Sequence, residues 1–436
     1  MICDFSDEQP PKMPPKRAAS GSQSATSSGV GATSGANKVP GMTARMLANA
    51  AKANGGGGSS SSSDSGNSAS AAAAVPTTSG RTRSSSGVKP TPKKAKTTPA
   101  VAAAVPKASR AKPANGGPAK GVKRKAIHQL SAVVDQGTAI KDAPSKKVFI
   151  VGKEFAQGGF GRIYTCKEEG TRTDLVLKME PSGNGPLFTE VNVFQRILKP
   201  DMIEAFIKKQ KENLGLKWLG IPHLIASGIF EYKDEKMRYL IMPKYHTCLE
   251  GIREKSGGKL DVKSTFTVAK SILRSLQYIH SVDYTHGDVK AGNILLEKDK
   301  DFSTAVLVDF GLARMAASNE DKPDKKRAHN GTCIFTSRDA HRGCQPSFRG
   351  DIEILVYNLL YWLTGTLPWL KFESDPDRVY QEKESFCKSS ATNVKKLLDP
   401  IDAKASKAVQ TLLEIALKCD YKDVPDYTAM LKAINN

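Results

Sequence analysis

The chain has 436 residues and carries 65 Lys and Arg against 44 Asp and Glu, a formal net charge of +21. Its seven cysteines are scattered with no C-x-x-C pair and no metal-ligand spacing, which favours reduced thiols in a cytosolic or nuclear protein over a disulfide framework. The sequence has no early apolar run of the signal-peptide kind and no continuous apolar stretch of about eighteen residues, so we expect neither secretion nor a membrane span.

Residues 1–146 are predicted to form a long disordered tail. No aromatic residue occurs between Phe5 and Phe149, and the segment is rich in Ser, Gly, Ala, Pro and Lys, so it cannot bury enough apolar surface to offset its conformational entropy. Residues 1–147 hold 22 Lys and Arg against 6 Asp and Glu, a net charge of +16. These loosely spaced cations indicate non-specific contact with DNA or chromatin, although they would also serve simply to keep the tail soluble.

Two short basic runs in the tail, at 92–96 and 123–125, are similar to nuclear import signals. We therefore expect a nuclear protein, or otherwise a cytoplasmic one.

A glycine-rich turn lies near the start of the remaining chain, residues 147–436. Apolar runs typical of strands flank it, and its residues are Gln157, Gly158, Gly159, Phe160 and Gly161. Glycine lets backbone amides approach a phosphate without hindrance from a Cβ atom. We expect these residues, with Ile163, to bind a nucleotide, although glycine-rich hairpins are common and Ala156 stands where the first glycine of such a motif is usual.

Lys178 ends an apolar run at 175–178, and Glu190 follows in the segment 186–194. A lysine at the end of a strand is ordinarily a solvent-exposed edge residue. At this distance after a glycine-rich turn, Lys178 is instead predicted to contact the α- and β-phosphates while Glu190, on the next helix, holds its ammonium group. Val176 replaces a usual alanine and is expected to tighten the adenine slot.

Residues 200–217 show helical periodicity and predict an additional amphipathic helix. Residues 238–242 predict a buried strand that leads into a hinge between two lobes. There Met242 is expected to line the back of the nucleotide pocket, while Pro243 offers its carbonyl oxygen and Tyr245 its N–H to adenine.

The strongest pattern is D-x-K-x-x-N at 288–293 followed by D-F-G at 309–311. An acidic turn between buried strands would explain one Asp and one Asn but not this joint spacing, which is typical of protein kinases. Asp288 is predicted to orient the substrate hydroxyl and accept its proton, and Lys290 to stabilise charge on the phosphoryl group that ATP transfers. Asn293 and Asp309 are predicted to hold Mg²⁺, for which Mn²⁺ could substitute.

Residues 262–280 and 350–365 are predicted helices, and the second is apolar nearly all round, as expected for a helix buried in a lobe. Asp351 at its start would either accept hydrogen bonds from the catalytic-loop backbone or cap the helix. The polar segment 314–330 is typical of a mobile activation loop.

Gly287 stands where many kinases have an arginine that binds a phosphate on the activation loop, so we expect activity without loop phosphorylation. Arg314, Lys325 or Arg327 could substitute for that arginine, and the glycine could simply relieve crowding in a tight turn.

Residues from about 148 to 436 resemble the vaccinia-related kinase family, within the casein-kinase-I-like group of Ser/Thr kinases. The resemblance rests on QGGFG at 157–161, NGPLFTE at 184–190, HGDVKAGN at 286–293, FTSRDAH at 335–341, RGDIEIL at 349–355 and WLTGTLPW at 362–369. It implies a bilobal kinase fold, ATP with magnesium and, for nuclear members, chromatin-associated substrates such as histones and the barrier-to-autointegration factor. Members usually carry long basic extensions after the catalytic domain, whereas here the long tail precedes it.

The sequence thus predicts an α+β, bilobal protein-kinase fold, with a small β-rich N-lobe at about 147–242 and a larger helical C-lobe at about 246–436. We expect a monomeric Ser/Thr protein kinase that acts on nuclear, chromatin-associated proteins. The alternative is a pseudokinase scaffold recruited to chromatin by its tail, which the departures at Ala156 and Val176 would support.

Overall fold

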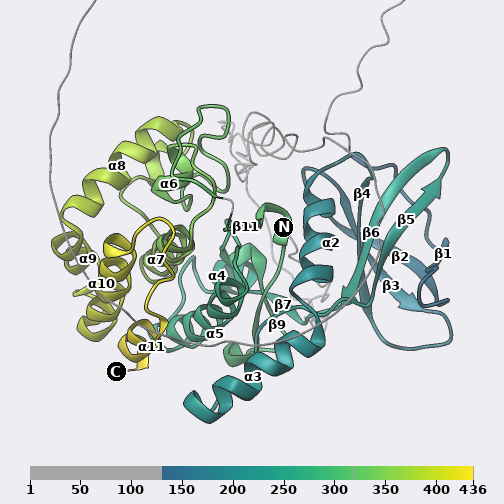
Figure 1. The fold of residues 1–436 in the computed structure, drawn as a ribbon, viewed down its shortest axis with the longest axis horizontal. Coiled ribbons are helices and arrows are strands. Elements are labelled where there is room, and N and C mark those ends of the chain that lie inside the picture. Colours follow the sequence, from purple (N-terminus) through teal and green to yellow (C-terminus); the bar gives the residue numbers. More distant parts are fainter. Residues whose placement is uncertain (1–129, 318, 436) are drawn as a thin grey trace, which may run out of the picture. The chain divides into compact units, whose positions relative to one another are not determined.

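The computed structural model describes residues 130–317 and 319–435, without the side chains of 212–214. The predicted tail falls largely on residues 1–129, which lie outside the described part of the chain. Figure 1 shows a lobe built on a sheet and a lobe built of helices, so the expected α+β, two-lobed architecture is confirmed.

The N-lobe is a six-stranded antiparallel sheet with the order β1-β2-β3-β4-β6-β5. Its strands are β1 (Ala139–Lys141), β2 (Val148–Gln157), β3 (Arg162–Glu168), β4 (Leu175–Pro181), β5 (Ala226–Tyr232) and β6 (Glu235–Pro243). One face of the sheet is covered by α2 (Pro186–Arg196), whose Leu187 and Phe194 are buried (Figure 1).

The sheet begins earlier in the chain than we expected. β1 pairs with β2, where Ile140 lies opposite Phe149, and both side chains are buried. The folded lobe therefore starts upstream of Lys147. A strand of three residues with a single buried apolar side chain carries too little periodicity to be recognised in the sequence.

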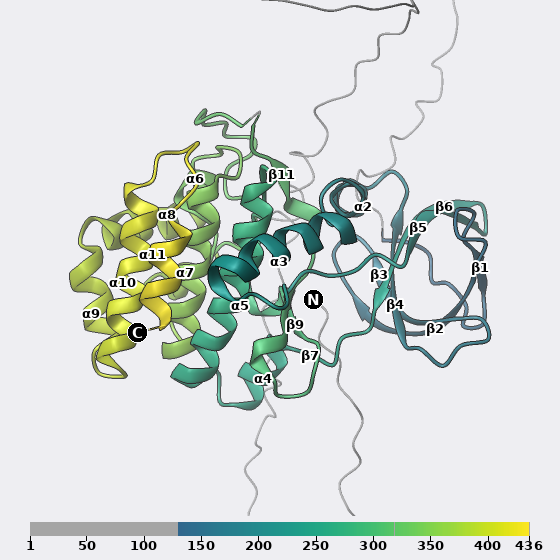
Figure 2. The ribbon, with the colours of Figure 1, turned by 60° about the horizontal axis from the view of Figure 1, so that its bottom comes forward.

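The additional helix predicted over 200–217 is α3 (Pro200–Leu214). Proline occupies its first turn, and Gly215 ends it in the left-handed conformation at φ 64°. The ring of Phe206 meets that of Tyr278 edge to face at 5.2 Å, so α3 packs on a helix of the C-lobe (Figure 2).

The C-lobe is mainly helical, and the predicted helices over 262–280 and 350–365 are confirmed. Its helices are α4 (Leu249–Lys255), α5 (Val262–Ser281), α6 (Arg338–His341), α7 (Phe348–Thr364), α8 (Pro376–Lys388), α9 (Ser390–Leu398), α10 (Ala403–Lys418) and α11 (Tyr427–Asn435). Nearly every side chain of α7 is buried, Trp362 included, because α7 is the central helix of the lobe. None of the helices within residues 130–435 is long and apolar enough to cross a membrane.

Short strands and single 3₁₀ turns complete the C-lobe. They are β7 (Thr247–Cys248), β8 (Tyr284–Thr285), β9 (Ile294–Leu296), β10 (Ala305–Leu307) and β11 (Arg314–Met315), with 3₁₀ turns η1 (Ala291–Asn293), η2 (Phe302–Thr304), η3 (Phe310–Leu312) and η4 (Leu370–Phe372). β9 pairs with β7 and β10, and β8 pairs with β11. These pairings fix both ends of the loop that carries Asp288.

Candidate active site

The loop between β8 and β9 holds Asp288, Lys290 and Asn293 in mutual contact. Lys290 Nζ lies 2.7 Å from Asp288 Oδ2, and Asn293 Nδ2 donates to the Asp288 carbonyl oxygen at 2.9 Å and to Oδ2 at 3.2 Å. Burial opposes ionisation of Asp288, but Lys290 outweighs it and holds the pKa of that carboxyl below its usual range. The structure therefore brings together an ionised carboxylate, a cation and an amide, as the sequence spacing predicted.

Thr332 completes this cluster, although the sequence analysis did not single it out. Its Oγ1 donates to Asp288 Oδ1 at 2.9 Å and accepts from Lys290 Nζ at 3.0 Å. Both carboxylate oxygens of Asp288 thus accept hydrogen bonds, Oδ1 from Thr332 and Oδ2 from Lys290. The only signal in the sequence was the place of Thr332 shortly before the string FTSRDAH.

Lys178 lies between two carboxylates contributed by distant elements. Its Nζ is 2.7 Å from Glu190 Oε2 on α2 and 3.2 Å from Asp309 Oδ1 at the start of η3. Burial disfavours the ammonium, but Asp309 and Glu190 outweigh it and raise the pKa of Lys178. Burial likewise disfavours ionised Asp309, but Lys178 outweighs it and lowers the pKa of that carboxyl. The predicted pairing of Lys178 with Glu190 is present, and Lys178 also contacts Asp309 of the D-F-G turn.

The glycine-rich turn is tight because the Gly158 N–H donates to the Gly161 carbonyl oxygen at 2.8 Å. A Cβ atom on Gly161 would lie 2.0 Å from the Met179 carbonyl oxygen on β4, so only glycine fits there. A Cβ atom on Gly158 would meet nothing closer than 3.8 Å. Phe160 is held in place through its carbonyl oxygen, which accepts from Asn184 Nδ2 at 3.0 Å.

The predicted nucleotide contacts away from the phosphates lie along adjacent strands. Ile163 on β3 is buried and is paired in register with Lys178 on β4. Met242 near the end of β6 is buried opposite Val176, and Pro243 follows opposite Leu175. Tyr245 lies two residues after β6 and packs against a hydrophobic cluster that contains residues of both lobes. Their role as a hinge and their contact with adenine stay predictions.

Asp351 resolves the alternative left open by the sequence. Its Oδ2 accepts from the His286 N–H and its Oδ1 from the Gly287 N–H, both at 2.7 Å, and His280 Nε2 lies 3.1 Å away. The cap of α7 is Ser347, whose Oγ accepts from the Gly350 N–H at 3.0 Å. Asp351 therefore holds the backbone of the catalytic loop and does not cap its helix.

The oxygen atoms of Asp309 and Asn293 are the donors available for a metal ion. Within residues 130–435 no group of three or more His, Cys, Asp or Glu side chains is suited to hold one. One carboxylate and one amide oxygen form a hard but incomplete ligand set, which is the kind that Mg²⁺ completes with water and substrate phosphate oxygens. Asn293 fits this role because its Nδ2 is engaged by Asp288, which leaves Oδ1 as the acceptor end of the amide.

Comparison with known proteins agrees with this arrangement. Residues 149–433 match the protein kinase domain family. Serine/threonine-protein kinase VRK1 of Caenorhabditis briggsae is 53% identical over 317 residues, 73% of this chain and 56% of that protein. Nucleosomal histone kinase 1 of Drosophila melanogaster is 37% identical, over 73% of this chain and 53% of that protein. The chain thus spans about half the length of these curated relatives.

The solved structure of vaccinia related kinase 3 superposes with a TM-score of 0.59 at 25% identity, covering 70% of this chain and 91% of the other. The D-x-K-x-x-N and D-F-G residues converge in one cluster, and sequence and fold are both similar to the same set of kinases. On this evidence the chain belongs to the vaccinia-related kinase family of protein kinases.

Proposed function

We propose that this protein is an active Ser/Thr protein kinase that transfers the γ-phosphoryl group of ATP to hydroxyl groups of other proteins. The observation that carries the proposal is the engagement of Asp288 by Lys290 at 2.7 Å and by Thr332 at 2.9 Å. A carboxylate fixed on both oxygens is positioned to receive a hydroxyl, and phosphoryl transfer depends mainly on positioning and electrostatics.

Each residue then has a distinct part in the reaction. Asp288, kept ionised, orients the substrate hydroxyl and accepts its proton. Lys290 supplies positive charge beside the transferring group, and its position two residues after Asp288 suits the Ser/Thr class of kinases. Lys178, held by Glu190, binds the α- and β-phosphates. Mg²⁺, held by Asp309 and Asn293, would neutralise the phosphate oxygens, and Mn²⁺ could substitute for it.

We further propose nuclear, chromatin-associated substrates, with histones as the first candidates. The support is the 37% identity to a protein named nucleosomal histone kinase 1 and the basic tail. On the same basis we propose nuclear localisation, and we propose that the enzyme acts as a monomer. The pseudokinase alternative is less favoured because relatives at 53% identity are named as serine/threonine-protein kinases.

The test is transfer of phosphate from Mg-ATP to histones by purified full-length protein. Asp288→Asn and Lys178→Met are each expected to lower the rate by at least about 100-fold. Lys167→Met is the matched control, because Lys167 lies on the neighbouring strand β3 and its side chain is 58% exposed. Stabilisation by nucleotide without phosphate transfer in the unaltered protein would support the pseudokinase instead.

We propose that the tail adds weak, non-specific DNA binding, because it carries many cations and almost no aromatic residues. Deletion should end at residue 129 and not at 146, since β1 and buried Ile140 belong to the sheet. The shortened protein is expected to lose DNA retention and keep activity on a short peptide. Unchanged DNA binding after the deletion would contradict the proposal.

A further inference from the structure

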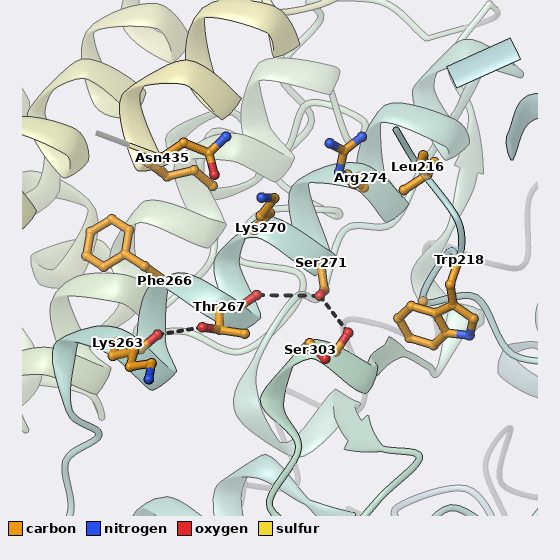
Figure 3. Close-up of a pocket in the computed structure, with 12 residues that line it drawn as sticks. Leu216, Trp218, Lys263, Phe266, Thr267, Lys270, Ser271, Arg274, Ser303 and Asn435 are labelled. Carbon is orange, nitrogen blue, oxygen red and sulfur yellow. Dashed lines mark hydrogen bonds between the residues drawn. The ribbon is translucent and has the colours of Figure 1, made fainter. Parts of the chain in front are cut away.

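A groove of about 570 Å³ lies on the C-lobe between α5, the segment that follows α3, and the end of α11 (Figure 3). It is lined by Leu216, Trp218, Gly220, Lys263, Phe266, Thr267, Lys270, Ser271, Arg274, Ser303, Ile434 and Asn435. None of these is among the active-site residues described above, so the groove is separate from the site of phosphoryl transfer.

Three cations follow one another along the groove face of α5. Lys263, Lys270 and Arg274 are seven and four residues apart, which places them about 10 Å and 6 Å apart along the helix axis. Figure 3 shows them spaced along this helix. Among the side chains that the structure describes, none forms an ion pair with any of the three.

Arg274 has an unsatisfied hydrogen-bond donor that faces the groove lining. Its Nη1 is enclosed and has no hydrogen-bond partner in the described part of the chain. Burial lowers the pKa of this guanidinium, and no carboxylate in the described part of the chain offsets the effect. An enclosed donor without an acceptor is costly, so its presence calls for an explanation such as a partner that is absent from the structure.

Two aspartates that lie near the groove in sequence already accept hydrogen bonds from neighbouring residues. Asp261 accepts from the Ser264 N–H at 2.9 Å as the cap of α5, and Asp301 accepts from the Ser303 N–H and Oγ at 3.0 and 2.6 Å. In the described part of the chain neither aspartate forms an ion pair with Lys263, Lys270 or Arg274, so these cations can accept a separate anionic group.

The groove also has apolar ends. Phe266 and Trp218 are each only partly buried, and Figure 3 shows them on opposite sides of Lys270 and Ser271. A ligand that carries acidic and aromatic side chains together would satisfy both features, whereas inorganic phosphate alone would leave the rings uncovered.

Such a sequence occurs once in the part of the chain before residue 130. Of the four acidic residues there, three lie at Asp4, Asp7 and Glu8, and Phe5 is the only aromatic residue. In extended form the stretch from Asp4 to Glu8 spans about 13 Å, close to the roughly 16 Å that separates Lys263 from Arg274 along α5. The chain that joins this stretch to residue 130 is far longer than needed to reach any face of the domain.

We propose that this groove binds residues 2–8 of the same chain. The carboxylates of Asp4, Asp7 and Glu8 pair with the three α5 cations, and Phe5 packs against Trp218. Docking of this acidic stretch would attach the start of the basic tail to the C-lobe. The lysines between residue 8 and residue 130 would stay free to bind a polyanion.

Zero-length carbodiimide crosslinking of the full-length protein tests the proposal, because it joins a carboxylate to a lysine only where the two are in contact. Mass spectrometry is expected to find Asp4, Asp7 or Glu8 joined to Lys263 or Lys270. Each exposed ion pair is worth about 0.2–1 kcal/mol, so Arg274→Glu, which keeps both lysines that form the crosslink, should lower its yield by about twofold or more. The groove variant used for the charge swap is Lys263→Glu, Lys270→Glu, Arg274→Glu. Lys388→Glu, an exposed position on α8, is the matched control and should leave the yield unchanged.

A charge swap separates docking from loss of folding. Adding Asp4→Lys, Asp7→Lys and Glu8→Lys to the groove variant should restore the crosslink. The amines would then lie in the tail segment and the carboxylates on α5. Equal crosslinking of residues 4–8 to lysines over the whole surface would overturn the proposal. Mixing isotopically heavy and light protein shows whether residues 4–8 come from the same chain or from another copy. Crosslinks that join a heavy chain to a light chain would show docking between copies and would overturn the assignment to the same chain.

Discussion

Lys383 offers a sharp test of how the C-lobe positions the active site. It lies on α8 and is fully buried, and its Nζ donates to the carbonyl oxygens of Cys333 at 2.9 Å and Thr336 at 2.7 Å. His341 Nε2 accepts a third hydrogen bond at 3.1 Å. The segment it holds begins next to Thr332, the residue that contacts Asp288. We therefore expect Lys383→Met to loosen this segment and to reach the active site through Thr332.

The magnitude follows from the three acceptors that would lose their donor. Each buried acceptor left unpaired costs roughly 1–3 kcal/mol. Removal of a buried cation offsets part of this loss, because the desolvation of a charge costs several kcal/mol. The net decrease in the free energy of unfolding at pH 7 is then about 2–4 kcal/mol, and displacement of Thr332 should lower kcat by about tenfold.

The effect of pH has a defined sign. Burial lowers the pKa of Lys383 to about 7, against about 10.4 for a lysine in an unfolded chain. Between these pH values the unfolded state binds more protons, so this lysine makes the folded protein more stable as pH rises from 7 to 10. The stability difference between the unaltered protein and Lys383→Met should therefore widen over that range and stay constant below it.

Denaturant unfolding from pH 6 to 10 and initial-rate kinetics measure these effects. Lys388→Met, on the exposed side of the same helix, is the control and should change neither quantity. Equal stability and equal kcat for Lys383→Met would refute the positioning role. A stability difference that does not vary with pH would mean that the three acceptors and the ring of Tyr357, 4.9 Å away, keep the lysine charged.

Asp351→Asn is expected to lower kcat by about 100-fold with little change in the KM for ATP, since an amide cannot accept from both loop N–H groups; an unchanged kcat in initial-rate assays would contradict this. Gly161→Ala should lower the melting temperature and raise the KM for ATP, because its Cβ would lie 2.0 Å from a carbonyl oxygen, whereas Gly158→Ala should be tolerated. Gly287→Ala should cost about 1–2 kcal/mol of stability, measured by denaturant unfolding, because φ is +83° there. Phosphatase-treated enzyme should start turnover without a lag, and a rate loss of about tenfold or more would indicate a phosphate switch.

The part of the site that could be predicted from the sequence is the part that is local in the chain. Asp288, Lys290 and Asn293 share one short loop, so their spacing alone brings them together. Lys178 and Glu190 lie on a strand and the helix that follows it, where the connection is short and the pairing is nearly determined by the order of elements. The motifs therefore sufficed for these residues.

The contacts that hold this cluster in place join segments far apart in the chain, and spacing does not specify them. Thr332 is 44 residues from Asp288, and Lys383 is 50 residues from Cys333. In the sequence Lys383 looks like any exposed helical lysine, because nothing local shows that α8 turns it inward. The sequence could not decide for the same reason whether Asp351 binds the catalytic-loop backbone or caps its helix. Only the packing of α7 against the loop determines which backbone N–H groups donate to it.

The conformation of Gly287 bears on whether a loop phosphate is needed. At φ +83° a Cβ atom would be strained, and it would also lie 3.3 Å from the Leu312 carbonyl oxygen, so the glycine is explained by its turn. Two of the substitute cations that we considered, Arg314 and Arg327, do line a hollow of about 250 Å³ beside it. The described catalytic loop is nevertheless held by Asp351, which accepts from the Gly287 N–H, and by Thr332, which donates to Asp288. Because these contacts involve no phosphate, an anion bound at Arg314 would add to an alignment that the fold already provides.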